Sequence, residues 1–244
     1  MRAVRSLVVF GAVIALTANT ATARAAEPFY ILAISWQSAF CEFAARKPEC
    51  KSQTVRRSDA GQFVLHGLWP QPARRQYCNV PGDVRAASAS GRWRDLPAPE
   101  LTPETKAELD VAMPGRQSFL DRHEWVKHGS CHAVPQAEIY FRDSLRLLRT
   151  INDSGLAELM RDNIGRRMSA SEIRAHFDEA FGAGTGERVR VACREDGDRR
   201  LITELTIGLR GDIPGGTPLP ELMLGAPPVG RGCPVGIVDA VGQQ

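Results

Sequence analysis

Six cysteines limit what this chain of 244 residues can fold into more than any other feature of its sequence. Their number is even and they form no CxxC pair, which favours disulfide bonds over a structural zinc site if the chain folds in an oxidising compartment. Such disulfides each contribute about 2–4 kcal/mol to stability. The cysteines are Cys41, Cys50, Cys78, Cys131, Cys193 and Cys233.

The pairing of these cysteines stays open, since six of them can combine in 15 ways. Because a short loop loses the least entropy on closure, Cys41–Cys50 is the favoured first bridge. A Cys193–Cys233 bridge would tie down the C-terminal segment. Cys78–Cys131 would then join two central regions of the chain.

The N-terminus has the features of a secretory signal peptide. Two arginines lie within the first five residues, an apolar run spans residues 7–16, and residues 23–25 form an A-x-A cleavage site. The apolar run is shorter than the roughly 20 residues that a membrane-spanning helix needs. We therefore predict a signal peptide over residues 1–25, and an exported domain, periplasmic or extracellular and without a membrane span, over residues 26–244.

The composition is that of a globular protein, with 43% hydrophobic and 24% charged residues. The formal net charge of +3 belongs to the precursor, because removing residues 1–25 removes three arginines and no acidic residue. Bulk charge therefore gives no reason to expect binding to nucleic acid, and any electrostatic attraction must be local.

Segments typical of strands lie toward both ends of this domain. Residues 29–36 form an apolar, aromatic run, and residues 63–65 form a second run that ends at His66-Gly67. Residues 189–209 predict a β-hairpin around a turn that contains Asp-Gly. A last short apolar piece covers residues 235–238.

Helical signals occupy the middle of the chain. A Thr-Pro start predicts a helix over residues 103–113, and an apolar stripe predicts a longer helix over residues 135–151. A Ser-Glu capping box predicts a third helix over residues 169–181. Residues 77–99, rich in Pro, Gly, Ser and Arg, predict a long irregular connection. Helices between strands favour a single α+β domain over alternating βαβ units.

Two short segments, FVLHGLWPQ around His66 and HEWVKHGSCH around His128, contain four of the five histidines. A helix over the second segment would place Glu124, Lys127 and His128 on one face, with His123 beside Lys127. Histidine gives and takes protons near neutral pH, so both segments together predict an acid–base site. A solvated, charged helix face is the plainer alternative.

The second segment is close to the zinc-binding pattern HExxH, but its second histidine lies five residues after the first. Five residues turn a helix by about 140°, so the two imidazoles cannot bind one ion from one helix face. The sequence also lacks the GxSxG pattern of a serine nucleophile, a P-loop and a GxGxxG pattern. We therefore expect neither a metal nor a cofactor.

Attack of an RNA ribose 2′-OH on its own 3′ phosphate suits the side chains that remain. One imidazole removes the 2′-OH proton while a second, protonated imidazole gives a proton to the leaving 5′ oxygen. A lysine neutralises charge on the equatorial oxygens of the phosphorane. The substrate supplies the nucleophile, so the protein needs none.

The two segments also resemble those of a known family. FVLHGLWP and HEWVKHGSC are similar, in the same order, to the catalytic segments of the ribonuclease T2 family of secreted, base-nonspecific ribonucleases. The run YILAISWQ before Cys41 and the triplet Tyr77-Cys78-Asn79 extend the resemblance over most of the chain. It implies an α+β fold, with an antiparallel sheet beneath the site and helices around it, and a Cys78–Cys131 bridge.

The resemblance implies a role for each matching residue of the site. His66 matches the general acid and His128 the general base. Glu124 and Lys127 match the pair that stabilises the pentacovalent phosphate, and His123 matches a histidine that binds the phosphate.

Two further residues bear on base recognition. Trp69 matches a residue that stacks on a base, although a core position is the alternative. Gln71 follows HGLWP at a position that varies and can contact the base, and Leu120 stands where many members have an aromatic residue. We expect packing for Trp36, Trp93 and Trp125, and surface positions or local hydrogen bonds for His132 and His176. For Arg56, Arg57, Arg74 and Arg75 we expect a solvated surface, with contacts to the phosphate backbone as the alternative.

Together these features predict a monomeric, exported endoribonuclease that cleaves single-stranded RNA through a 2′,3′-cyclic phosphate to 3′-phosphate ends. Two alternatives remain: a secreted binding or toxin-like protein that has lost turnover, and a metal-dependent phosphodiesterase. The complete set of His66, Glu124, Lys127 and His128 argues against the first. Sensitivity to a chelator would identify the second.

Overall fold

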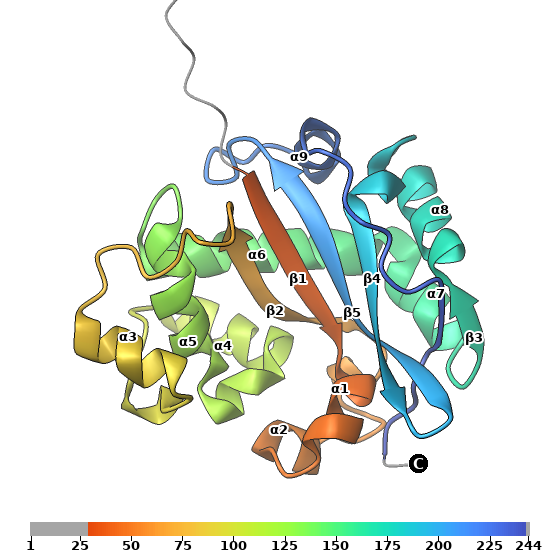
Figure 1. Ribbon diagram of the computed structural model, residues 1–244, viewed down its shortest axis with the longest axis horizontal. Helices are drawn as coiled ribbons and strands as arrows, with labels where there is room; N and C mark the ends of the chain where they lie inside the picture. Colours follow the sequence, from red (N-terminus) through yellow and green to blue (C-terminus); the bar gives the residue numbers. More distant parts are fainter. Residues whose placement is uncertain (1–28, 243–244) are drawn as a thin grey trace, which may run out of the picture.

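β1 (Phe29–Trp36) is an inner strand of the sheet, in a computed structural model that describes residues 29–242. It pairs antiparallel with β2 (Phe63–Pro70) on one side and with β5 (Arg199–Arg210) on the other (Figure 1). The predicted strand over residues 29–36 is confirmed. The predicted signal peptide lies outside the described residues.

The sheet continues beyond β5 in two directions. β4 (Val189–Asp196) forms an antiparallel hairpin with β5, as predicted. The start of β5 meets β6 (Val235–Ile237) in a short parallel contact, and β6 pairs antiparallel with β3 (Arg167–Ser169). The order is therefore β2-β1-β5-β6-β3, with β4 also on β5. The predicted α+β domain, with a largely antiparallel sheet flanked by helices, is confirmed.

The helix α6 (Ala137–Ile151) crosses the back of the sheet in Figure 1. Its apolar stripe, predicted from the sequence, packs into the main core, where Tyr140, Phe141 and Ile151 are fully buried. Other helices are α1 (Gln37–Ala44), α2 (Pro48–Lys51), α3 (Gly82–Ala89), α4 (Pro103–Ala112), α5 (Leu120–Lys127), α7 (Ala157–Asp162), α8 (Ala170–Phe181) and α9 (Leu219–Gly225). Short helical turns cover Ser58–Ala60, Trp93–Asp95, Pro114–Ser118, Gly129–Cys131, Asn152–Leu156 and Thr185–Arg188.

The alternation of side chains along β1 separates a core face from a second face. Tyr30, Leu32 and Ile34 are at most 1% exposed and belong to the main core. Each such side chain contributes about 1.5–3 kcal/mol when buried. Ser35 lies on the opposite face and pairs with Glu204 of β5, so both side chains leave the sheet on that second face.

The two helix starts predicted from capping residues are confirmed. The hydroxyl of Thr102 accepts a hydrogen bond from the backbone N–H of Thr105 at the start of α4. Ser169 and Glu172 form the predicted capping box of α8. Caps of this kind satisfy backbone N–H groups that the first helical turn leaves unpaired.

Two predictions about irregular segments are wrong. The strand expected at residues 63–65 does not end at His66-Gly67 but runs on to Pro70. The connection expected over residues 77–99 contains α3 and the turn Trp93–Asp95. A small second core of Ala87, Leu96 and Val126 buries the apolar side of this segment against α5, and no helical pattern in the sequence signals that contact.

The disulfides within residues 29–242 are Cys41–Cys50, Cys78–Cys131 and Cys193–Cys233, as predicted, and no cysteine there is free. Cys78–Cys131 joins the segment after β2 to the turn after α5. The backbone N–H of Tyr77 also donates to the Lys127 carbonyl at 2.9 Å. The β2 and α5 segments are therefore tied together beside the histidines.

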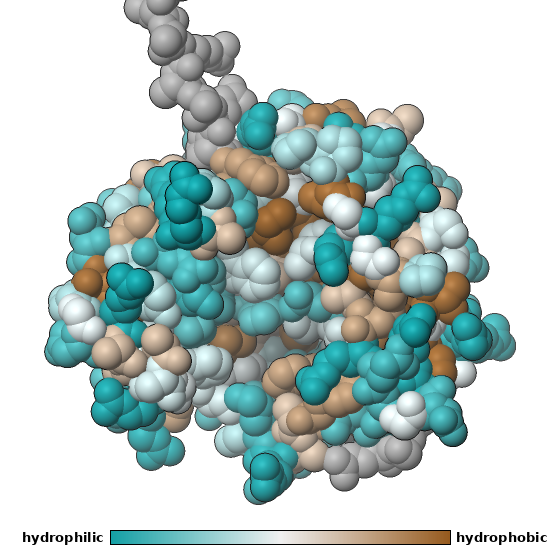
Figure 2. Space-filling model, in the orientation of Figure 1, coloured by the Kyte–Doolittle hydropathy of each residue, from teal (hydrophilic) through white to brown (hydrophobic). Residues whose placement is uncertain are grey.

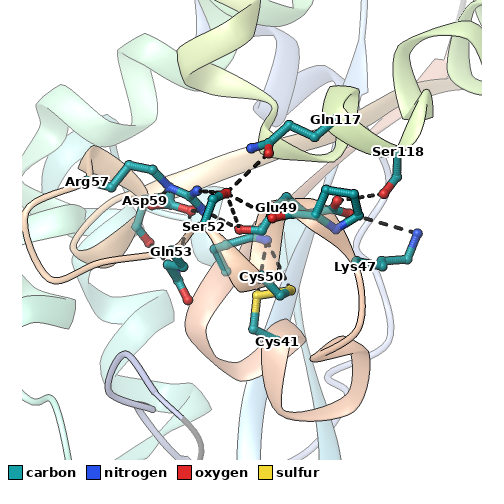
Figure 3. The surroundings of a disulfide bond; sticks show 12 residues. Cys41, Lys47, Glu49, Cys50, Ser52, Gln53, Arg57, Asp59, Gln117 and Ser118 are labelled. Carbon is teal, nitrogen blue, oxygen red and sulfur yellow. Dashed lines mark hydrogen bonds and ion pairs between the residues drawn. A yellow bond between two sulfur atoms is a disulfide. The ribbon is translucent and has the colours of Figure 1, made fainter.

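Polar contacts surround the Cys41–Cys50 bridge between α1 and α2 (Figure 3). Arg57 donates to both carboxylate oxygens of Asp59 and to the carbonyl of Glu49. Ser118 donates to the buried carboxylate of Glu49 at 2.6 Å. Arg57 was expected on a solvated surface and is instead part of this network, whereas Arg56, Arg74 and Arg75 are exposed as expected.

Replacing both Cys78 and Cys131 with alanine should lower the free energy of unfolding by about 2–5 kcal/mol, because the unfolded chain regains the entropy of a 53-residue loop. Urea denaturation measures the loss. Removing Cys41 and Cys50, which close a loop of 9 residues, is the matched control and should cost less. A double variant of Cys78 and Cys131 as stable as the parent would contradict this expectation.

Candidate active site

An irregularity in β2 takes His66 out of the regular strand alternation. Gly67 pairs with Ala33 of β1 and Leu65 pairs with Ile34, so His66 falls at a bulge in the described ladder. A bulge inserts one extra residue and re-aims the side chain beside it. The imidazole of His66 is consequently 36% exposed, between the buried residues Leu65 and Gly67.

The second histidine segment lies on α5, beside β2. Glu124 is 2% exposed, while His123 and Lys127 are half-buried. His128 ends the helix, and its backbone N–H donates to the Glu124 carbonyl at 2.9 Å. The helix expected for this segment is therefore present, and its residues 123–127 together with the residue that follows it carry all four side chains.

The backbone of β2 meets α5 at Gly67. A Cβ atom on this residue would lie 1.9 Å from Oε2 of Glu124 and 2.6 Å from Nε1 of Trp69. The indole Nε1 of Trp69 donates to Oε2 of Glu124 at 2.9 Å. Only glycine leaves the space in which this buried carboxylate receives its hydrogen bond.

Trp69 lies beside both imidazoles. Its ring centroid is 5.2 Å from that of His66, in an edge-to-face arrangement, and 5.5 Å from that of His128. The side chains of His66, Glu124 and His128 therefore lie around the indole of Trp69. Whether this indole also stacks on a base stays a prediction.

His66 has a carboxylate partner from a distant strand. Its Nδ1 lies 2.6 Å from Oε2 of Glu204 on β5. Burial lowers the pKa of His66, but the hydrogen bond to Glu204 and the negative charges of Glu124 and Glu204 outweigh it. The pKa of His66 is therefore raised, which favours the imidazolium near neutral pH.

The other two imidazoles shift the other way. Burial, with the charges of Lys127, His123 and His66, lowers the pKa of His128 to about 3. Burial, with Lys127 and His66, lowers the pKa of His123 to about 4. Among the described residues, Nδ1 of His128 is buried without a hydrogen-bond partner. Both imidazoles are neutral near pH 7.

His123 is oriented by residues that the sequence did not single out. Its Nδ1 lies 2.8 Å from the hydroxyl of Ser88 on α3, which in turn contacts the hydroxyl of Tyr77. Its ring stacks on Trp93, with centroids 4.5 Å apart. Trp93 was expected only to pack, and it also supports a candidate site residue.

The carboxyl of Glu124 is held in a mixed environment. Burial raises its pKa, while His66, the hydrogen bond from Trp69 and the charge of Lys127 oppose the rise without cancelling it. A carboxyl with a raised pKa holds a proton more readily than one in water.

Other sequence candidates lie outside this cluster or at its edge. The side-chain amide of Gln71 donates to the backbone carbonyl of Trp69 at 3.2 Å. His132 makes the expected local hydrogen bond, to the Val134 carbonyl, but it is 3% exposed instead of lying at the surface. His176 is half-buried and contacts the Ser154 hydroxyl.

A cavity of about 280 Å³ opens beside His66 on the second face of the sheet. Ser35, Glu204 and Leu120 line it, together with Phe40 and Trp93. Figure 2 shows the surface hollowed between the α3–α5 side of the molecule and the α1–α2 segment. Leu120, the departure noted in the sequence, is therefore part of a hollow next to the histidines.

Two other kinds of site have no counterpart in residues 29–242. No group of three or more His, Cys, Asp or Glu side chains there is arranged to hold a metal ion. In the same part of the chain, no helix is long and apolar enough to cross a membrane.

Comparison with known proteins places these residues in a family. The family model described as "Ribonuclease T2 family" matches residues 27–214. Ribonuclease I of Escherichia coli is 30% identical over 209 residues, which cover 75% of this chain and 75% of that protein. Ribonuclease 1 of Arabidopsis thaliana is 28% identical over 174 residues, 69% of each chain.

Solved structures share the fold at lower identity. Ribonuclease MC1 from the seeds of bitter gourd has a TM-score of 0.53 and 18% identity, over 86% of this chain and 99% of that one. A mutant of the same enzyme, solved in complex with 5′-UMP, has a TM-score of 0.56 and 18% identity over 88% and 100%. The α+β fold is thus the fold of these ribonuclease structures. The chain belongs to the ribonuclease T2 family and is an endoribonuclease.

Replacing Gly67 with alanine should disturb the site, because the new methyl group would overlap the carboxylate of Glu124. We expect a loss of about 1–3 kcal/mol in the free energy of unfolding, together with reduced RNA cleavage. Urea denaturation and an RNA digestion assay measure the two effects. Gly82→Ala, where a Cβ meets nothing within 4 Å, is the matched control and should retain both properties. Equal behaviour of the two variants would show that no such crowding exists.

Proposed function

We propose that this endoribonuclease cleaves single-stranded RNA by transphosphorylation without a metal ion, with His66 as general acid and His128 as general base. One observation carries the proposal: two imidazoles beside the same indole have pKa values shifted in opposite directions. A group that is protonated near neutral pH suits the acid, and a neutral imidazole suits the base.

The proton transfers balance in this assignment. His128 accepts the proton of the 2′-OH as the bond between O2′ and phosphorus forms. His66 gives its proton to O5′ as the bond between phosphorus and O5′ breaks, which leaves a 2′,3′-cyclic phosphate. Water then opens the cyclic phosphate to a 3′-phosphate, and the two histidines exchange roles.

The groups between the histidines suit the charge that develops on phosphorus. Lys127 neutralises the equatorial oxygens of the phosphorane. Glu124, held by the hydrogen bond from Trp69 at the same end of α5, is the second group that we assign to the phosphorane. His123, neutral and held by Ser88, donates a hydrogen bond to the phosphate.

Nucleotide binding by relatives supports RNA as the substrate. The solved ribonuclease MC1 mutant holds 5′-UMP, and we extend this chemistry to the present chain. Trp69 offers an indole for stacking on a base, and Gln71, fixed on the Trp69 carbonyl, lies close enough in the chain to contact the same base.

We further propose that the protein acts after export, in a periplasm or outside the cell, as a monomer. The N-terminal segment has the charged, apolar and cleavage regions of a signal peptide. Disulfides at all six cysteines support an oxidising compartment.

The chemistry of the nucleophile provides a direct test. The protein should cleave RNA in the presence of EDTA to products with 2′,3′-cyclic phosphate and then 3′-phosphate ends. It should leave DNA and 2′-O-methylated RNA of the same sequence intact, because both lack the attacking hydroxyl. Analysis of end groups identifies the products. Loss of activity in EDTA would favour the metal-dependent alternative, and cleavage of the methylated strand would refute 2′-OH attack.

The pH dependence of kcat/KM should have two limbs of different origin. The rate rises with pH as His128 loses its proton, and because its pKa is lowered to about 3, this limb lies well below pH 6.5. The rate falls again as His66 loses its proton, and because its pKa is raised, this limb lies above pH 6.5. Initial rates on a dinucleotide between pH 2 and pH 9 give both limbs.

Alanine variants test whether the two limbs of the pH profile belong to His66 and His128. His66→Ala and His128→Ala should each lower the rate by about 10²–10⁴ while the fold persists. His176→Ala, a half-buried histidine outside the cluster, is the matched control and should leave the rate unchanged. A folded His66 or His128 variant with parental turnover would refute the paired-histidine assignment.

A further inference from the structure

We propose that Glu204 is a positioning residue for His66: it binds Nδ1, so that Nε2 presents the proton for the leaving oxygen. The proposal rests on the acid role of His66 proposed above. Glu204 lies outside both histidine segments and 138 residues from His66 in the chain.

The sheet brings the two side chains together across β1. Glu204 is on β5 and His66 is on β2, the two strands that flank β1. Ser35 of β1 lies directly opposite Glu204 and lines the same cavity as both side chains. Its short side chain leaves room above β1 for the contact between Oε2 of Glu204 and Nδ1 of His66 at 2.6 Å.

Both partners lie next to strand irregularities. His66 falls at the bulge between β1 and β2. On the other side, Ala192 of β4 pairs with Glu204 and Cys193 pairs with Ile202, so Thr203 falls at a second bulge immediately before Glu204. Bulges occur often beside active sites and re-aim side chains. The His66 bulge and the irregularity beside Glu204 lie on the two strands that flank β1, where the two side chains meet.

The exposure of the two groups fits a hydrogen bond that acts at the site. The Glu204 side chain is 20% exposed, and that of His66 is 36% exposed. Nδ1 of His66 is therefore bound to Glu204, while the His66 side chain also lines the cavity. Several charged or titratable groups face His66. They are Glu204 from β5, Glu124, Lys127 and His123 from α5, and His128 at the end of α5. The adjoining cavity is also lined by Arg194, Lys47 and Glu49.

A carboxylate on Nδ1 has two chemical consequences. It stabilises the imidazolium, so His66 stays protonated before the first step. After Nε2 gives its proton to O5′, the neutral ring keeps its remaining proton at Nδ1, bound to Glu204. The tautomer with a free Nε2 lone pair is then ready to accept a proton from water in the second step.

The experiment compares Glu204→Gln, Glu204→Asp and Glu195→Gln. Glutamine is nearly the same size but uncharged, and aspartate keeps the charge on a shorter side chain. Glu195 is an exposed glutamate of the same sheet, paired with Arg200 away from the site, and it is the matched control. We measure kcat and KM against pH, and the NMR titration of the imidazole protons of His66 without substrate.

In Glu204→Gln we expect the His66 titration and the alkaline limb of kcat to move together to lower pH. At pH 8 kcat should fall by about 10–100-fold, less than on loss of His66 itself, while activity at acidic pH and KM change little. Glu204→Asp should restore part of the titration shift. Glu195→Gln should match the parent.

The outcomes separate this proposal from the function it rests on. An unchanged His66 titration in Glu204→Gln overturns the positioning role, whatever the rates are. A loss of kcat that is uniform across pH, with the limb in place, also overturns it, because that is the result of a merely structural role. Parental turnover of His66→Ala refutes instead the acid role of His66.

Discussion

The contact between the backbone of Gly67 and the buried carboxyl of Glu124 is the constraint on which the site depends. A carboxylate that is 2% exposed is costly unless hydrogen bonds compensate the lost water, and Trp69 supplies one. This arrangement requires α5 to lie against β2 with no side chain between them. Cys78–Cys131 and the small second core hold the two segments at that separation.

The different charge states of the histidines follow from what surrounds each of them. Burial lowers the pKa of both His66 and His128. Of these two histidines, only His66 has a carboxylate within hydrogen-bond distance among the described residues. That difference decides the direction in which the pKa of His66 shifts. The charge of Lys127 and two other imidazoles, those of His123 and His66, reinforce the effect of burial on His128. The neighbours of each imidazole thus set the direction of its pKa shift, since the two side chains are chemically identical.

Much of the fold could be predicted from the sequence, wherever a local pattern had a local cause. The cap at Thr102, the capping box of Ser169 and Glu172 and the hairpin of β4 and β5 involve residues close together in the chain. The continuation of β2 past His66 and the helix α3 could not be predicted. Pairing with β1 maintains the strand past His66, and burial of Ala87 against α5 stabilises α3. Both causes are contacts with distant residues.

The sequence by itself determined which chemical groups are available: two histidine segments, the i,i+4 relation of Glu124 and His128, and cysteines enough to close the loops around them. Only the tertiary structure decided that Glu204 meets His66 and that Ser88 meets His123. Neither partner belongs to a recognisable motif. Their positions arise from strand order, two bulges and the packing of α3 on α5, which are long-range interactions that no short stretch of sequence encodes.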